Sequence, residues 1–321
     1  MAGVSMTAVS FVLNNKPGVS DETREHIQKI IDETGFKPNL NSKKLLFNKS
    51  FNICVMISPD ASPFEDLFYF EVTRGILNKS REHGYNISIN EPNYEDNELP
   101  DVVYTGDTDG IIFMQDISDA LTEKAISSGV PFVVVDSHSL SDKVTSINPN
   151  YHGAAYSATS YLLSLGHRNI AMISSNVVPR FHEQTRSGFL SAMQEYGLKP
   201  AKEALAQSVR TETEAYDAAR LLLSAVDRPT ALLCTVDTFA IGAMHCAKDM
   251  GLRIPEDVSI VGIDDVVLAR YTDPKLTTVG IDKVHMGELA MDLLLQKIEG
   301  GTAKSRSLPM DLIVRASARQ L

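Results

Sequence analysis

The stretch that decides the fold is GIIFMQDISDALTEKAISSGVPFVVVD, residues 110–136. Two apolar runs, Gly110–Gln115 and Pro131–Asp136, flank a segment near 118–128 that has the length and polarity of an amphipathic helix. A strand that is apolar throughout is buried on both faces, which is typical of a parallel sheet covered by helices. The sequence therefore predicts a strand–helix–strand unit here.

The same alternation continues on both sides of this unit. Helices are expected near residues 66–83, 151–165, 185–196, 213–224 and 238–250. The further strands expected between them are Phe51–Ser58, Asn86–Asn90, Asn169–Ser174, Thr230–Thr235 and Ser259–Gly262. This number of strands in about 270 residues is more than a single lobe usually contains, which favours an α/β fold of two doubly wound parallel-sheet lobes. We expect the break between the lobes at Asn148-Pro149-Asn150, and a late helix, 283–299, before a last extended stretch, Ser307–Arg315.

The first fifty residues have a different character, because they indicate short helices and no strand. Val9, Val12 and Leu13 recur at helical spacing and form one apolar stripe. The other face of that helix carries Met6, Thr7, Ser10, Phe11 and Asn14. Phe11 has two interpretations: an exposed side chain on this second face, or an aromatic residue of the core.

A second helix is expected to begin after Ser20, which has the side chain of an N-cap residue, and to end at Gly35. The segment that follows is short and basic and lacks an apolar stripe of its own. We predict a small all-α head over residues 1–38 and a linker over residues 39–50.

Charge is distributed unevenly along the chain. Residues 1–50 carry seven Lys and Arg against five Asp and Glu, whereas the other 271 residues carry 23 against 36. A mildly basic head tolerates phosphates, while an acidic body repels them. If this chain contacts nucleic acid, the contact is expected in the head.

Composition limits the class of protein further. Hydrophobic residues at 43% and charged residues at 22% are ordinary for a globular protein. The sequence has no apolar run of membrane-spanning length, and Met1–Ser5 has neither a basic nor an apolar leader, so export is not expected. Cys54, Cys234 and Cys246 follow no pairing motif and are expected to be reduced thiols.

Motifs of catalysis and of metal or nucleotide binding are missing from the sequence. We find no phosphate-binding loop, dinucleotide fingerprint, nucleophile elbow or zinc spacing, and we expect no cofactor and no metal. Asp264-Asp265 follows an apolar strand and could serve as a pair of acids. Residues at the carboxyl end of a strand in an open α/β sheet line a ligand crevice with or without chemistry, so we favour binding.

Several segments together resemble one family. The segment from Ala2 to Asn14, AGVSMTAVSFVLN, resembles the recognition-helix signature A-G-V-S-x-x-T-V-S-x-V-L-N of the LacI/GalR (lactose/galactose repressor) family. The head segments Ser20–Arg24 and Gly35–Asn39 are also similar to the family. In the body the similar segments, in family order, are Phe51–Asp60, Asp109–Ile112, Gly166–Ala171, Gly188-Phe189, Pro229–Ala231, Ala240–Met244, Val261–Asp265 and Leu276–Val279. The resemblance covers essentially the whole chain.

The resemblance implies a fold and an activity. It implies a helix-turn-helix head and a periplasmic-binding-protein-like body, whose first lobe is 51–149 plus about 283–304 and whose second lobe is 150–282 plus about 305–321. The implied protein is a cytoplasmic homodimeric transcription regulator, a repressor, that binds operator DNA and responds to a sugar or related metabolite. It is not an enzyme.

Roles in DNA binding follow from the same resemblance. Met6, Thr7 and Phe11, with Ser10 and Asn14 beside them, would face the bases of the major groove. Lys43 and Lys44 would contact phosphates, and Leu45 would wedge into the minor groove. The alternative for Leu45 is that it packs the linker onto the body. The family's head has a helix before the Ala-Gly-Val-Ser signature, and this chain begins at the signature, so we expect a head that lacks part of its packing.

The resemblance also places an effector site between the lobes. The implied effector-binding residues are Ser58, Asp60, Phe64, Asp136, Arg186, Asp237 and Asp264. Carboxylates beside aromatic rings suit a sugar, whose hydroxyls donate to the former and whose C–H faces contact the latter. Thr185, Val236 and Ile281 depart from the polar residues of the family. We therefore expect common hexoses to bind poorly, and a smaller or less polar ligand. The segment 94–108 is expected to replace a regular helix.

Three other functions stay open from the sequence. One is a ligand-sensing or partner-binding protein of the same fold that does not bind DNA, including a variant on which a phosphorylated carrier protein docks. The second is an exported sugar-binding protein, which shares the body plan. The third is an enzyme, for which the paired aspartates are the one sign.

Overall fold

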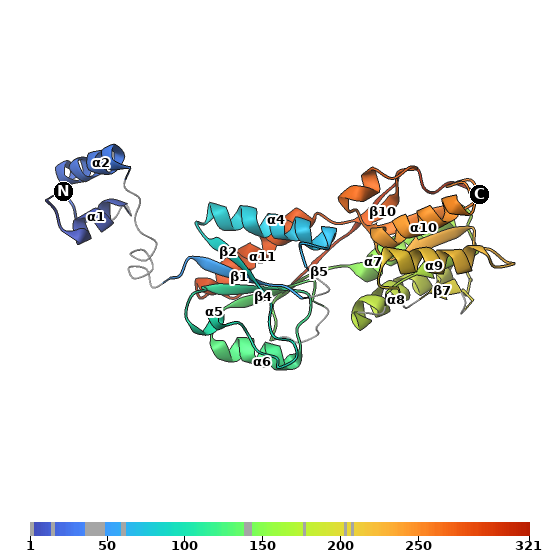
Figure 1. Ribbon diagram of the computed structural model, residues 1–321, viewed down its shortest axis with the longest axis horizontal. Coiled ribbons are helices and arrows are strands. Elements are labelled where there is room, and N and C mark those ends of the chain that lie inside the picture. The colour runs from blue at the N-terminus through green and yellow to red at the C-terminus, as the bar shows by residue number, and fades with distance from the viewer. Residues whose placement is uncertain are drawn as a thin grey trace. The chain divides into compact units, whose positions relative to one another are not determined.

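The computed structural model describes residues 3–13, 17–35, 49–58, 62–137, 143–175, 178–201, 204–206 and 209–321. The chain divides into two compact units, Met1–Phe51 and Asn52–Leu321, and each is described by itself. Figure 1 shows the helical unit at the N-terminus and the α/β unit that follows it in sequence.

The N-terminal unit contains helices α1 (Met6–Leu13) and α2 (Asp21–Thr34). The Ser20 hydroxyl accepts a hydrogen bond from the backbone N–H of Thr23 (3.3 Å), and Gly35 ends α2 with a left-handed φ of 61°, as both residue types predict. Val12 and Ile27 are buried. The two predicted head helices are therefore present.

The face that was predicted to read DNA is described in part. Thr7 is exposed, and Ser10 and Phe11 are half-buried. A Cβ atom added at Gly18 would lie 2.9 Å from the Phe11 ring, so the ring packs against the turn after α1. Asn14, Lys43, Lys44 and Leu45 lie outside the described residues.

The body contains two six-stranded sheets of matching order (Figure 1). The first has the order β11-β5-β4-β3-β1-β2 and pairs all its neighbours in parallel. Its strands are β1 (Asn52–Met56), β2 (Asn86–Asn90), β3 (Gly110–Met114), β4 (Phe132–Val135), β5 (Ser146–Pro149) and β11 (Arg306–Leu308). The second sheet has the order β12-β10-β9-β8-β6-β7 and is parallel except for β12. Its strands are β6 (Ile170–Ile173), β7 (Leu205–Ala206), β8 (Ala231–Cys234), β9 (Ser259–Asp264), β10 (Thr277–Gly280) and β12 (Asp311–Ile313).

Helices cover both faces of each sheet. The first is covered on one face by α4 (Leu67–Glu82) and α11 (Lys283–Ile298), and on the other by α5 (Asp101–Tyr104) and α6 (Asp119–Ser128) (Figure 1). The second packs α7 (Tyr151–Ser164) and α8 (Pro179–Glu195) on one face, and α9 (Glu212–Leu223) and α10 (Asp237–Asp249) on the other. Central strands are buried on both faces, which explains their continuous apolar runs. The predicted two-lobed α/β fold is confirmed.

Glycines let the helices on one face of each sheet approach closely. A Cβ at Gly75 of α4 would lie 2.0 Å from the backbone oxygen of Val284 in α11. In the second lobe, a Cβ at Gly188 of α8 would lie 2.2 Å from the backbone oxygen of His152 in α7. No other residue type fits at either contact without moving a helix.

The chain passes between the lobes at three places, after β5, after β10 and after β11. The boundary near residue 304 predicted from the sequence is too early, because β11 pairs with β5 of the first sheet and the last passage therefore lies between Leu308 and Asp311. Around residues 94–108 the structure has one bridge, Asn93 with Glu98, and the short α5, in place of a long helix.

Candidate functional site

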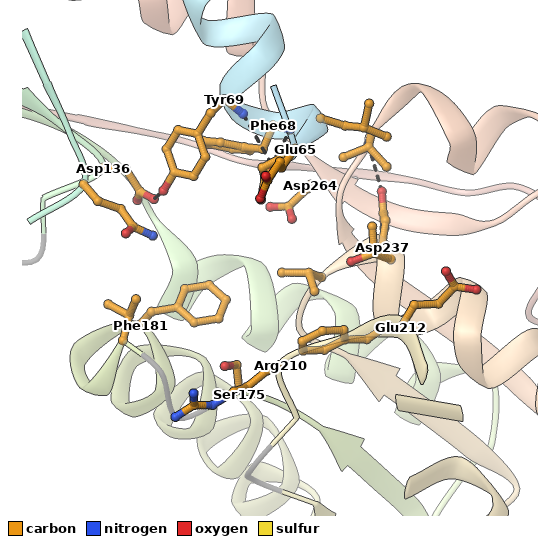
Figure 2. A pocket seen from close by; sticks show the side chains of 18 of the residues that line it. Glu65, Phe68, Tyr69, Asp136, Ser175, Phe181, Arg210, Glu212, Asp237 and Asp264 are labelled. Atoms are coloured by element: carbon orange, nitrogen blue, oxygen red, sulfur yellow. Dashed lines mark hydrogen bonds between the residues drawn. The ribbon is translucent and has the colours of Figure 1, made fainter. Parts of the chain in front are cut away.

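A cavity of about 530 Å³ lies where the two sheets present the carboxyl ends of their strands, a size in the usual range for small-molecule sites. Both lobes contribute to its walls (Figure 2). The first lobe supplies Glu65, Asp66, Leu67, Phe68, Tyr69, Gln115 and Asp136. The second lobe supplies Tyr151, Ser175, Val178, Phe181, Arg210, Glu212, Val236, Asp237, Thr238, Phe239, Asp264, Val266 and Leu268.

The wall of the first lobe is built around α4. Asp66 is the N-cap of this helix, and its carboxylate accepts hydrogen bonds from the backbone N–H groups of Phe68 (2.7 Å) and Tyr69 (3.4 Å). Asp136 follows β4 with a left-handed φ of 58°, and its carboxylate accepts a 2.6 Å hydrogen bond from the Tyr69 hydroxyl. Burial raises the pKa of Tyr69, and the charge of Asp136 raises it further, so the phenol stays protonated and donates.

Asp237, at the start of α10, uses its carboxylate inside the protein. It is fully buried and accepts hydrogen bonds from the Thr278 hydroxyl (2.6 Å) and the backbone N–H of Val266 (2.9 Å). Burial raises the pKa of Asp237 to about 7 against these two stabilising bonds. The side chain therefore joins α10 to the segments after β9 and in β10.

Asp264, the last residue of β9, differs from these carboxylates. It is 6% exposed and has a left-handed φ of 113°. Within the described part of the chain, its carboxylate makes no hydrogen bond, although its backbone oxygen accepts one from the Nζ of Lys283 (2.6 Å). Burial, and then the neighbouring Asp237, raise the pKa of Asp264 well above its ordinary value. Figure 2 shows its carboxylate turned into the cavity.

Aromatic rings complete the cavity. Tyr151 and Phe181 meet edge to face with ring centroids 4.6 Å apart, and Phe68 and Tyr69 do so at 5.1 Å. Burial raises the pKa of Tyr151 well above its ordinary value, and nearby Asp136 raises it further. The cavity thus combines flat apolar faces with acceptor groups.

The structure brings together some of the predicted effector residues and leaves others apart. Asp136, Asp237 and Asp264 line the cavity. Ser58 does not, but it is buried and its hydroxyl donates to the lining residue Gln115 (3.3 Å). Phe64, at 76% exposed, and Arg186, on an exposed face of α8, are not part of the lining. Asp60 lies outside the described residues.

The three departures from the family pattern lie in different surroundings. Val236 lines the cavity, so an apolar side chain does face the ligand there. Thr185 is buried, and its hydroxyl donates to the backbone oxygen of Phe181 (2.9 Å) in its own helix. Ile281 packs against the core of the first lobe. Only Val236 therefore alters the lining directly.

Several lining residues were missed from the sequence. Gln115 could have been found, because it ends a predicted strand and strand ends line the crevice. Asp66 carried the signal of an N-cap before a predicted helix. Tyr69, Phe181 and Arg210 had no comparable signal, since their direction depends on how helices and loops pack.

Two other kinds of site were searched in the described residues. They contain no group of three or more His, Cys, Asp or Glu side chains arranged to hold a metal ion. They also include no helix that is both long and apolar enough to cross a membrane.

A helical head and a two-lobed α/β body with a cavity at facing strand ends define a ligand-responsive regulator. Family models agree: "Bacterial regulatory proteins, lacI family" matches residues 1–39, and "Periplasmic binding protein-like domain" matches residues 159–318. The chain is 32% identical to catabolite control protein A of Priestia megaterium, over 99% of this chain and 97% of that protein. It is 31% identical to the transcriptional repressor CytR of Escherichia coli K12, over 100% and 94%. The chain belongs to the LacI family of transcription regulators.

A solved structure agrees along the length of the chain. The transcriptional regulator CelR in complex with cellobiose superposes with a TM-score of 0.76 at 25% identity, over 98% of this chain and 97% of that one. The protein is accordingly a transcription regulator with a DNA-binding head and an effector-binding body.

Proposed function

We propose that the protein is a homodimeric, cytoplasmic repressor that binds operator DNA through residues 1–50 and releases it when a small molecule occupies the cavity between the lobes. The observation that carries the proposal is a largely buried carboxylate, that of Asp264, turned into a cavity that both lobes line. A ligand that contacts both walls favours one angle between the lobes over others, and so shifts the conformation that binds DNA. Pairing of heads in a dimer matches the paired half-sites of operators.

In the head, we propose that α1 enters the major groove. Met6, Thr7, Ser10, Phe11 and Asn14 would face the bases, and Lys43, Lys44 and Leu45 would contact the backbone and minor groove. Thr7 is exposed on α1, which supports this role. Phe11 packs partly on the turn at Gly18, so its free edge would contact a thymine methyl group.

In the body, we propose that Asp136 and Asp264 bind the effector, that Asp237 holds the wall in place through its bonds to Thr278 and Val266, and that none of the three is catalytic. The paired aspartates do not face a common reactant, because both oxygens of Asp265 form ion pairs, with Arg315 and with Arg270. Asp265 thus joins the strand end to neighbouring segments of the same lobe. A single open carboxylate in a cavity is suited to hold a ligand.

The experiment that tests the proposal removes residues 1–50. We expect the full chain to be retained by operator DNA and the truncated chain, still folded and dimeric, not to be retained. The matched control is the full chain on DNA of unrelated sequence at the same salt concentration, since phosphate contacts alone depend steeply on salt. Retention of the truncated chain would overturn the assignment of the head. A full chain that does not bind DNA would favour the ligand-sensing alternative, with or without a docking carrier protein.

A further inference from the structure

The charge of the cavity lining is strongly one-sided. Among the described residues that line the cavity, Arg210 is the only Lys or Arg. The carboxylates that line it are Glu65, Asp66, Asp136, Glu212, Asp237 and Asp264. An excess of this size is costly to confine in one cavity, because like charges at short range oppose each other's ionisation.

Arg210 does not offset this excess at the centre of the cavity. Its side chain is exposed, and Figure 2 shows its guanidinium beside Ser175, across the cavity from Asp264. Glu212 has a partner outside the centre, His245, whose Nδ1 lies 3.4 Å from its carboxylate. The carboxylates of Asp66, Asp136 and Asp237 all lie near enough to that of Asp264 to raise its pKa.

Lys283 lies close to Asp264, but its ammonium group bonds to backbone oxygens. Its Nζ donates to the backbone oxygens of Asp264 (2.6 Å) and Asp265 (3.0 Å), and it lies 4.0 Å from Glu71. Its positive charge therefore opposes the rise in the pKa of Asp264, but it does not bond to the Asp264 carboxylate. That carboxylate stays buried, turned into the cavity and without a hydrogen-bond donor in the described residues.

The rings around this carboxylate suit the same kind of ligand. Tyr69, Tyr151 and Phe181 all line the cavity. A cation gains from contact with the face of an aromatic ring, and the gain grows when water is excluded. Buried carboxylates beside aromatic rings therefore offer an ammonium group both hydrogen-bond acceptors and π faces.

We propose that the effector is a small organic cation, whose protonated amine donates to the Asp264 carboxylate while its body packs among Tyr69, Tyr151 and Phe181. This inference rests on the proposed effector site and specifies the ligand's charge. A neutral polyol would pair with the acceptors but would not compensate the negative charge that Asp264 takes on when it ionises, whereas an ammonium group does both.

The experiment compares amines with neutral molecules of the same shape. Calorimetric titration of the full chain would use two sets of probes: D-glucosamine against D-glucose and N-acetyl-D-glucosamine, and benzylamine against benzyl alcohol. We expect at least one amine to bind about tenfold or more tightly than its neutral counterparts. In Asp264→Asn, which keeps the shape but removes the charge, this ratio should fall toward one.

Two further variants complete the design. Asp311→Asn changes an exposed aspartate of β12 outside the cavity and should keep the wild-type ratio. Arg210→Gln removes the lining cation and should tighten amine binding, whereas a neutral effector would be indifferent to it or lose a donor. Circular dichroism establishes that each variant is folded.

Each outcome decides the inference. Neutral probes that bind as tightly as both amines would overturn the inference. It would also be overturned if neither amine binds at concentrations on the order of 10 mM, roughly the weakest affinity that calorimetry detects. Its failure is separate from failure of the proposed function. If a neutral sugar releases operator DNA, the repressor stands and the cationic effector falls. If an amine binds but never changes DNA retention, the binding site stands and its regulatory role falls.

Discussion

Each lobe has an aspartate at the same place in its sheet, but the two aspartates differ in their hydrogen-bond partners. Strands β4 and β9 hold equivalent positions in sheets of matching order, and Asp136 and Asp264 stand at their carboxyl ends with left-handed φ angles. The first accepts a hydrogen bond from Tyr69, whereas the second has no donor in the described part of the chain. The fold therefore fixes where a carboxylate reaches the cavity, and the neighbouring side chains decide whether that carboxylate accepts a hydrogen bond from the protein.

The difference bears on the proposed effector site, because a buried carboxylate without a hydrogen-bond donor lowers stability. Three of the inner carboxylates, Asp66, Asp136 and Asp237, accept hydrogen bonds from the protein. Asp264 alone among these four keeps its acceptor capacity for something else. A group held in this way favours binding at the expense of stability.

The largest expected effect is the dependence of stability on pH. The pKa of Asp237 is raised to about 7 in the folded protein, above its unfolded value, so its contribution to stability is complete below about pH 4 and is lost as pH rises to 7. The loss approaches 1.4 kcal/mol per pH unit, or about 4 kcal/mol over this window. Urea denaturation of the wild type and of Asp237→Asn at several pH values measures it. Equal slopes in both proteins would contradict the assignment.

A smaller effect is expected from neutralising the open carboxylate. Asp264→Asn should stabilise the body by about 1–2 kcal/mol at pH 8, because it removes a buried charge and no hydrogen bond to the side chain is lost. Denaturation midpoints at pH 8 and pH 4 check this, and the gain should shrink at pH 4, where the acid is protonated. Destabilisation at pH 8 would show that Asp264 already has a partner.

The smallest effect concerns the equivalent position in the first lobe. Tyr69→Phe removes the donor of the 2.6 Å hydrogen bond to Asp136 and makes that aspartate more like Asp264. We expect a loss of about 1 kcal/mol in the free energy of unfolding. Thermal or urea unfolding measures it, with Tyr104→Phe, an exposed tyrosine of α5, as the control. If Tyr69→Phe is as stable as that control, the hydrogen bond from Tyr69 does not stabilise Asp136, and the proposed difference between the two aspartates is wrong.

Much of the fold could be predicted from the sequence, because central strands that are buried on both faces consist of continuous runs of apolar residues. The strands that were missed lack that signal. Strand β5 reads Ser-Ile-Asn-Pro, and β10 reads Thr-Thr-Val-Gly with both threonines fully buried. Their burial comes from neighbours distant in the sequence, which local periodicity does not record.

The site was predictable to the extent that strand ends define it. Asp136 and Asp264 follow from that rule and from the family resemblance. Residues on helices are harder, because a shift of one position changes the face. On α8, Thr185 turns into the lobe, whereas Arg186 turns to solvent. Which carboxylate is left open depends on Tyr69 and Thr278, whose contacts form only in the folded protein.

The three passages between the lobes have a consequence for synthesis on the ribosome. The first lobe begins at β1, but it lacks its last strand until Leu308 has been added, about 160 residues after Pro149, which takes roughly 8–30 seconds at common elongation rates. Until α11 arrives, the face of α4 around Gly75 has no partner. The head precedes both lobes in the chain and can fold during this interval, while the last strands of the two lobes, β11 and β12, are added almost together.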